Sequence, residues 1–311
     1  MKVYINREPV SGPWGGGNKT VTALAENLKT NGHDVVFSLQ QDIDVIFCFD
    51  PRPNNKNEWY QTFLDYRFQN NNCKIIQRVG DIGTHGKPEL TNLVKKSSIL
   101  SDFVIFPSDW ARKTIGYKKK NYSIIHNAPN DKFLKSKVHK NTEIQKTKIV
   151  THHWSNNPLK GFDFYAKLRD YISLNNKEIE FTYIGRCPEE LASNGINIIS
   201  PLSEDMLVSE LPKYDIYLTA SKWEAGANHV LEAMSAGLPV VYHADGGSIP
   251  EYCFEFGIDY SNFDEMIEAI NTIKSNFSYY KNKLSKFDKK MSTTIIEYQD
   301  IISHITKRES T

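Results

Sequence analysis

Cysteine is scarce in this chain of 311 residues, and its four copies stand far apart in the sequence. Cys48, Cys73, Cys187 and Cys253 form no C-x-x-C pair, so we expect neither a disulfide framework nor a zinc site. Reduced thiols are typical of a cytosolic compartment. The cysteines therefore favour a cytoplasmic protein.

Long apolar runs are also missing. No stretch approaches the roughly 20 apolar residues that a membrane-spanning helix needs. The first residues, Met1 to Ile5, indicate the start of a strand followed by polar residues, which is not the pattern of a signal peptide. A cytoplasmic location is again the expectation.

Several common nucleotide-binding and metal-binding motifs are also missing from the sequence. No Gly-Lys-Ser/Thr follows the glycine-rich segment Ser11–Asn18, and its spacing is not G-x-G-x-x-G, which argues against a P-loop NTPase and a Rossmann oxidoreductase. No cluster of His, Cys and carboxylate residues has metal-ligand spacing. We therefore expect no metal ion, no cofactor and no nucleic-acid partner.

The composition that is present suits two domains with sizeable cores, since 40% of the residues are hydrophobic and 24% are charged. The net charge of +1 conceals an asymmetry: residues 1–150 hold 23 Lys and Arg against 14 Asp and Glu, and residues 151–311 hold 15 against 23. A basic first half suits an anionic acceptor or peripheral contact with an anionic membrane. An equal alternative is that the basic and acidic halves are solvated faces that attract each other across a cleft.

The most informative segment runs from Ser221 to Val241. Strands are expected at Asp215–Ala220 and Pro239–Tyr242, with a helix that begins near Ala227 between them. Glu232 then lies in the second helical turn and Glu224 on the loop before it, at the carboxyl end of a parallel strand, where ligands of such sheets bind. A surface helix with two solvated glutamates is the competing interpretation.

The start of this helix is expected to bind an anion. Its first N–H groups, those of Gly226, Ala227 and Asn228, have no partner within the helix and carry partial positive charge. Together with the two glutamates, they predict an anionic ligand that also carries hydroxyl groups.

The rest of the chain alternates short apolar strands with helical segments, which predicts parallel α/β sheets. After the glycine-rich segment, a helix is expected over Lys19–Asn31. Periodicity is lost over the lysine-rich stretch Leu134–Lys148, which is typical of an interdomain linker. Further helices are expected at Asn262–Lys274 and beyond Tyr279. The other strands are expected at Lys2–Ile5, Val35–Ser38, Val45–Phe49, Lys74–Val79, Phe103–Phe106, Tyr122–His126, Lys148–Thr151 and Glu180–Arg186.

The segment from Glu224 to Val241 resembles the retaining, nucleotide-sugar-dependent glycosyltransferases of family 4, which carry E-x7-E followed by E-A-M-A-x-G-x-P-V-V. Gly246–Glu251 and Ile124–Phe133 resemble two further motifs of that family. The resemblance implies a GT-B fold, in which two Rossmann-like domains face each other across a cleft and a C-terminal helix crosses back. It divides the chain into an acceptor-side domain (1–134), a linker (135–147), a donor-binding domain (148–278) and a helical segment that packs on the first domain (279–311).

The same resemblance implies a function: metal-independent transfer of a sugar from a nucleotide-diphosphate sugar to a hydroxyl of a glycan, lipid-linked or other acceptor, with retention of configuration. Lys160 would stabilise the departing diphosphate, Glu232 would hold the ribose and Glu224 the transferred sugar. Catalytic roles then fall to Lys160, Glu224 and Asp81. Donor-binding roles fall to Gly16, Gly17, Ser155, Lys160, Gly185, Arg186, Pro201, Leu202, Glu224, Ala225, Gly226, Ala227, Asn228 and Glu232.

Two departures from the family pattern bear on activity. The arginine that precedes the lysine in the family has no counterpart before Lys160. Hydrogen bonds from His153, Ser155 or Asn156 would then help to hold the diphosphate, and Arg186 is a candidate for the missing cation. Glycine stands at position 80, where the family has histidine, so Asp81 is the candidate polar residue and His85 a weaker one. A catalytically weak or inactive nucleotide-sugar-binding protein is the alternative.

Overall fold

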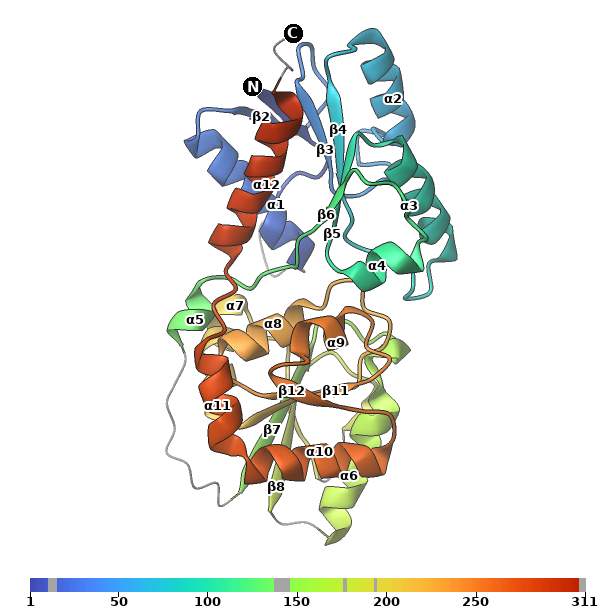
Figure 1. The fold of residues 1–311 in the computed structure, drawn as a ribbon. Coiled ribbons are helices and arrows are strands. Elements are labelled where there is room, and N and C mark those ends of the chain that lie inside the picture. Colours follow the sequence, from blue (N-terminus) through green and yellow to red (C-terminus); the bar gives the residue numbers. More distant parts are fainter. Residues whose placement is uncertain (11–15, 137–145, 176–177, 193–194, 308–311) are drawn as a thin grey trace. The chain divides into compact units, whose positions relative to one another are not determined.

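The computed structural model describes residues 1–10, 16–136, 146–175, 178–192 and 195–307. Two compact units divide the chain: unit 1 comprises Met1–Asn127 and Met291–Thr311, and unit 2 comprises Ala128–Lys290. Each unit is a parallel sheet with helices on both faces (Figure 1). The predicted fold class, α/β with two Rossmann-like domains, is confirmed.

The sheet of unit 1 has the strand order β2-β1-β3-β4-β5-β6, and all its pairings are parallel. Its strands read as apolar runs because helices cover both faces, as in β3, where all four residues are buried. The strands are β1 (Lys2–Ile5), β2 (Asp34–Val36), β3 (Val45–Cys48), β4 (Lys74–Arg78), β5 (Phe103–Phe106) and β6 (Tyr122–Ile124).

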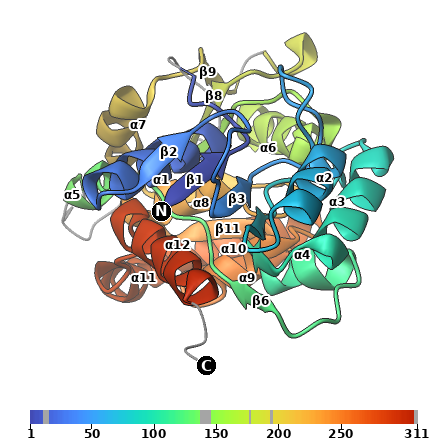
Figure 2. The ribbon, with the colours of Figure 1, turned by 90° about the horizontal axis from the view of Figure 1, so that it is seen from above.

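One face of this sheet is covered by α1 (Gly16–Thr30) and α12 (Met291–Thr306), which lie side by side (Figures 1 and 2). The apolar faces of α1 and α12 share one core with the strands, and the Tyr298 and Phe47 rings have their centroids 6.1 Å apart. On the other face lie α2 (Tyr60–Gln69) and α3 (Pro88–Leu100), and α4 (Asp109–Thr114) follows β5. The last helix of the chain therefore completes the core of its first unit.

The sheet of unit 2 has the strand order β12-β11-β10-β7-β8-β9, again entirely parallel. The chain adds strands on one side of β7 and then crosses to the other side with β10, so the topological switch point lies between β7 and β10. Ligands of open α/β sheets bind at such a point, beyond the carboxyl ends of the strands. The strands are β7 (Thr147–His153), β8 (Ile179–Gly185), β9 (Asn197–Ile199), β10 (Ile216–Thr219), β11 (Val240–His243) and β12 (Gly257–Tyr260).

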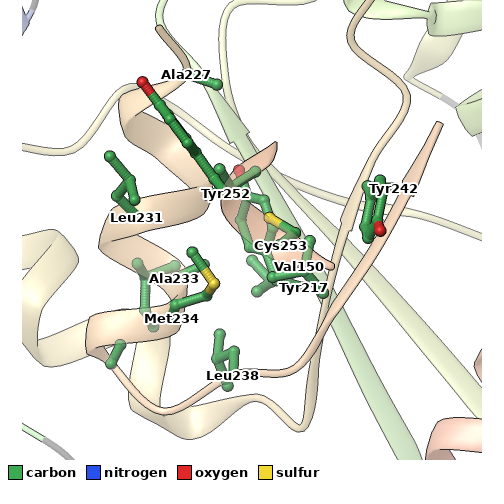
Figure 3. Close-up of a cluster of buried hydrophobic side chains, with 14 of the residues drawn as sticks. Val150, Tyr217, Ala227, Leu231, Ala233, Met234, Leu238, Tyr242, Tyr252 and Cys253 are labelled. Carbon is green, nitrogen blue, oxygen red and sulfur yellow. The ribbon is translucent and has the colours of Figure 1, made fainter. Parts of the chain in front are cut away.

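Alternating side chains of β7 and β10 point into two separate cores. Val150 and Tyr217 pack with Leu231 and Met234 of one helix layer, while Ile149 packs on the opposite face (Figure 3). The layer above Val150 contains α5 (Lys132–Lys135), α7 (Glu204–Glu210), α8 (Asn228–Ser235), α9 (Ser248–Cys253) and α11 (Phe277–Ser285). The opposite face carries α6 (Phe162–Asn175) and α10 (Phe263–Ser275), and three short 3-10 turns are η1 (Pro158–Lys160), η2 (Glu189–Leu191) and η3 (Leu211–Lys213).

The ends of α8 explain its position. It begins at Asn228, as expected, and it ends at Ser235 because Gly237 takes a left-handed conformation with φ of 85°. The Gly237 N–H donates to Met234 O and the Leu238 N–H to Ala233 O, at 2.9 and 3.0 Å, which closes the helix and starts β11 two residues later.

Three expectations need correction. Gly16 and Gly17 are the first residues of α1 rather than part of a loop. The helix extends back beyond Lys19, and the Thr20 hydroxyl donates to Gly16 O at 3.0 Å. Residues 11–15 of the expected loop lie outside the described part. The units divide at Asn127 and Lys290 rather than at 134 and 278, because α5 and α11 pack in unit 2. The expected linker 135–147 begins in α5 and ends in β7, and its residues 137–145 are outside the description.

Candidate functional site

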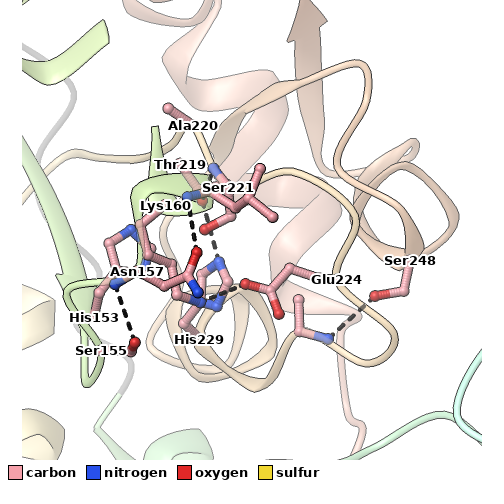
Figure 4. A network of polar contacts seen from close by, with 12 residues as sticks. His153, Ser155, Asn157, Lys160, Thr219, Ala220, Ser221, Glu224, His229 and Ser248 are labelled. Carbon is pink, nitrogen blue, oxygen red and sulfur yellow. Dashed lines mark hydrogen bonds and ion pairs between the residues drawn. The ribbon is translucent and has the colours of Figure 1, made fainter. Parts of the chain in front are cut away.

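Two segments that follow neighbouring strands meet at the switch point of unit 2. Lys160 closes the turn η1 after β7, and Glu224 lies on the loop after β10; their side chains form an ion pair (Figure 4). Both side chains are largely buried, with 12% and 15% of their surfaces exposed. A pair held in this way is screened little by water, so its charges are well placed for a ligand that brings charge of its own.

Glycines with positive φ lie close to the backbone segments that carry Lys160 and Glu224. Gly161, with φ of 77°, ends η1, and a Cβ there would lie 2.4 Å from Ala220 O. Gly247, with φ of 72°, lies against the backbone of Glu224, where a Cβ would meet Glu224 O at 2.5 Å. Trp223 itself has a positive φ of 55°, which a residue with a side chain rarely adopts. The loop that carries Glu224 is therefore held in a strained and closely packed conformation.

Hydrogen bonds tie that loop to the one after β11. The Trp223 N–H donates to Asp245 O at 2.9 Å, and the Ser248 N–H donates to Glu224 O at 2.8 Å. The Lys222 N–H donates to Leu159 O at 2.9 Å, which joins the loop to η1 as well. The three segments that follow β7, β10 and β11 thus position Glu224 together.

Glu232 lies one helical turn into α8, 8% exposed, and His152 of β7 contacts it. His152 Nε2 lies 2.8 Å from Glu232 Oε2, and because a carboxylate only accepts, that nitrogen carries the proton. The backbone of His152 is held too, since the Tyr217 hydroxyl accepts from its N–H at 3.1 Å and donates to its carbonyl at 3.2 Å. The structure therefore fixes the position of the second glutamate through a histidine that was not a sequence candidate.

The adjacent His153 points to the opposite face, as expected for neighbours on a strand. Its Nε2 lies 2.8 Å from the Tyr165 hydroxyl and 3.2 Å from Thr151 Oγ1. Burial, and then the charge of Lys160, lower the pKa of His153 well below its usual value. The same two causes lower the pKa of His229, whose Nε2 lies 3.1 Å from Thr219 Oγ1, to about 3. Both imidazoles are neutral near pH 7.

Other predicted donor residues of unit 2 lie at the same edge of the sheet. Gly185 ends β8, and the guanidinium of Arg186 stacks on the indole ring of Trp154, 5.0 Å from its centroid. Ser155 accepts from the Asn157 N–H at 3.1 Å. Pro201 and Leu202 follow β9, and Leu202 packs against the core rather than only facing outward. Arg186 is thus at the predicted edge, where it is exposed and stacked on an aromatic ring.

The expected anion site at the start of α8 needs revision. The Ala227 N–H donates to the Ser248 hydroxyl at 3.1 Å, so this donor is already used within unit 2 (Figure 4). Of the predicted donors here, Ala227 at least is engaged by a hydroxyl that the sequence pattern did not connect to it, because Ser248 lies 21 residues away.

In unit 1, Asp81 follows β4 and is engaged by its own neighbours. Its Oδ1 accepts from the Gly83 N–H at 2.8 Å, and its Oδ2 pairs with Lys87 Nζ at 3.0 Å. Gly16 and Gly17 lie in the first turn of α1. These three candidates and the weaker candidate His85 belong to unit 1, whereas the other predicted site residues belong to unit 2.

Within the described residues, no group of three or more His, Cys, Asp or Glu side chains could hold a metal ion. A D-x-D sequence does occur, at Asp42-Ile43-Asp44, but it precedes β3 at the amino end of the sheet. There Asp44 Oδ2 accepts from the Lys2 N–H at 2.7 Å. In the described part of the chain, no helix is both long enough and apolar enough to span a bilayer.

Solved structures with this fold include glycosyltransferases. HepE from Anabaena, in complex with UDP, is 13% identical, with a TM-score of 0.71 over 97% of this chain and 99% of that one. The catalytic domain of starch synthase IV from Arabidopsis thaliana, bound to ADP and acarbose, is 13% identical, with a TM-score of 0.67 over 99% of both chains. Sucrose-phosphate synthase from Thermosynechococcus elongatus is 15% identical, with a TM-score of 0.66 over 98% of this chain and 97% of that one.

Comparison with curated protein sequences finds no match. A family model does match: residues 149–276, from β7 into α10, fit the glycosyl transferases group 1 family. This segment contains Lys160, Glu224, Glu232 and His152. The chain thus has the GT-B fold of the structures above, and its residues 149–276 match the glycosyl transferases group 1 family.

Proposed function

We propose that this protein transfers a sugar from a nucleotide-diphosphate sugar to an acceptor hydroxyl, with retention of configuration and without a metal ion. The observation that carries the proposal is the buried pair of Lys160 and Glu224 at the switch point of a group 1 domain. Complexes of similar structures with UDP and with ADP support the nucleotide part of the donor.

The ion pair suits a donor that carries both an anion and hydroxyl groups. The diphosphate of such a donor would replace Glu224 as the partner of Lys160. The sugar hydroxyls would replace Lys160 as donors to Glu224. Neither charge is then left buried and unpaired when the ligand binds, which would be costly. Glu232, held by His152, would accept from the ribose hydroxyls.

The transfer itself needs few groups. The bond between the anomeric carbon and the diphosphate breaks, its electron pair leaves with the phosphate, and an acceptor oxygen bonds to the same carbon. The acceptor proton would pass to the leaving phosphate, whose growing charge Lys160 stabilises. Arg186, on the same edge of the sheet, is the candidate for a second cation. Asp81, Gly16 and Gly17 belong to unit 1, which we assign to the acceptor, and unit 2 to the donor.

A thermal-shift screen against nucleoside diphosphates and nucleotide sugars tests the donor, because a ligand that binds the native state raises its melting temperature. Glu232→Ala should weaken binding of the best nucleotide about ten- to hundredfold, as expected for loss of a charge-assisted hydrogen bond. Glu268→Ala, at an exposed position of α10, is the matched control. A screen without any stabilising nucleotide, or equal affinity in Glu232→Ala, would contradict the donor assignment.

Activity is tested on the nucleotide sugar found in that screen. Slow hydrolysis or transfer by the purified protein would distinguish an enzyme from a protein that only binds the donor. NMR of the first product formed reports whether the anomeric configuration is retained. Turnover should persist in excess EDTA; complete loss, restored by magnesium or manganese, would sink the metal-independent mechanism.

A further inference from the structure

The carboxyl end of β4 in unit 1 holds a buried arginine. Arg78 is the last residue of the strand and is 5% exposed. Its Nη2 donates to Asn127 Oδ1 at 2.6 Å, and its guanidinium lies over the ring of Phe49, 5.7 Å from the centroid. Both neighbours are neutral, so neither balances the positive charge.

The other basic side chains at this edge of the sheet do have acidic partners. Arg7 and Arg52 both pair with Asp50, at 3.1 and 2.6 Å, and Lys87 pairs with Asp81 at 3.0 Å. Arg78 pairs with no carboxylate among the residues of unit 1 that the structure describes. A buried charge is ordinarily paired, because water no longer stabilises it. The guanidinium therefore points to an anion other than the carboxylates that the structure describes in unit 1.

Gly80 leaves room for such an anion. A Cβ at position 80 would lie 2.8 Å from Arg78 Nη1, so any other residue there would crowd the guanidinium. This is the position at which the resemblance predicted a histidine. Because Gly80 has no side chain, it leaves the Arg78 guanidinium accessible. The remaining N–H donors of Arg78 have no acceptor within the described part of unit 1.

We propose that Arg78 binds a carboxylate or phosphate group carried by the sugar acceptor. The planar guanidinium presents parallel N–H donors that match either oxyanion in a two-pronged contact, which a neutral hydroxyl cannot form. Arg78 would then select an acidic acceptor, while Asn127 and Phe49 hold the guanidinium in place. That the bound anionic sugar is the acceptor rests on the function proposed above. Its binding to Arg78 does not depend on that function.

Calorimetric titration of the full chain tests this with three sugars: glucuronate, glucose 6-phosphate and neutral glucose. We expect at least one of the two anions to bind ten- to hundredfold more tightly than glucose. Whichever anion binds better identifies the source of the charge as a carboxylate or a phosphate. Arg78→Gln should abolish the preference, and Arg78→Lys should keep part of it. Arg52→Gln removes an equal charge from the same edge and should leave the preference intact.

Gly80→Ala keeps the charge but crowds the guanidinium, so it should reduce the preference as well. It also guards against misfolding of Arg78→Gln, and thermal unfolding of each variant shows whether unit 1 is intact. Equal affinity of wild-type protein for charged and neutral sugars would overturn the proposal. So would an unchanged preference in folded Arg78→Gln or Gly80→Ala. No donor or turnover enters these titrations, so a protein that binds anionic sugars but transfers nothing would refute the proposed function alone.

Discussion

At the scale of single residues, the charge of Lys160 both holds the site together and takes part in the proposed transfer. This ammonium pairs with the carboxylate of Glu224. Burial, and then the charge of the same ammonium, lower the pKa values of His153 and His229. One cation therefore influences three side chains of the site. Its removal should affect catalysis and the titration of the site in separable ways.

Lys160→Ala should lower kcat much more than it raises the donor KM, since the charge matters most as the phosphate leaves. Lys160→Arg should restore part of the rate, because the guanidinium is charged but bulkier. Steady-state kinetics on the donor found by screening measures both constants. A raised donor KM with an unchanged kcat would instead assign Lys160 to donor binding alone.

His229 predicts how stability depends on pH. Its pKa falls from 6.5 in the unfolded chain to about 3 in the folded protein, so between these values the unfolded state binds more protons. Stability from this group is therefore present above pH 6.5 and is lost as the pH falls, by about 1.4 kcal/mol per pH unit. His229→Gln should flatten the pH dependence of the unfolding free energy between pH 6 and 4 by about that slope. Parallel curves for the two proteins would contradict this.

At the scale of elements, the loop that carries Glu224 depends on the glycine beneath it. Gly247→Ala would place a Cβ 2.5 Å from the backbone carbonyl oxygen of Glu224, so the backbone that carries the Glu224 side chain must shift. We expect turnover to fall about a hundredfold, the cost of misplacing a reacting group by roughly 1 Å. Gly116→Ala is the control, since Gly116 has a similar φ of 70° but open space around it. If both variants lose stability but neither loses turnover, the loop does not position Glu224.

Much of this element structure was predictable from the sequence. Buried parallel strands read as short apolar runs, and Phe103–Phe106 was placed without error. The strand at Gly257–Tyr260 was missed, because one of its four residues is exposed, two are half-buried, and a glycine begins it. The predicted start of α8 is confirmed, because its small residues and apolar spacing are local signals.

The contacts that define the site were less predictable. His152 and Glu232 are 80 residues apart, and Lys160 and Glu224 are 64 apart, so their pairing depends on strand order rather than on spacing in the sequence. Arg78 and Asn127 meet for the same reason, at the ends of β4 and β6. A motif identifies such residues, but only the sheet topology shows which of them face each other.

At the scale of the whole molecule, unit 1 depends on the last helix of the chain. Met291, Ile295, Tyr298 and Ile302 of α12 are all buried in its core. Burying one such side chain contributes roughly 1.5 to 3 kcal/mol, so losing four is comparable with the entire stability of a domain. A chain ending at Lys290 should therefore lose hydrogen-exchange protection in β1 and β3, while β10 and β11 keep theirs. A chain ending at Lys307 is the control, and unchanged protection in β1 would refute the dependence.

This arrangement also sets an order of events on the ribosome. Unit 2 is one continuous stretch, Ala128–Lys290, and all of it emerges before α12 does. Residues 1–127 emerge earlier still, but the apolar surface of α1 and β3 that α12 covers stays uncovered until α12 has emerged. Of the two units, unit 1 is thus the one that starts to emerge earlier and is completed later. For that interval its exposed surface is the part of the nascent chain most open to chaperones and to aggregation.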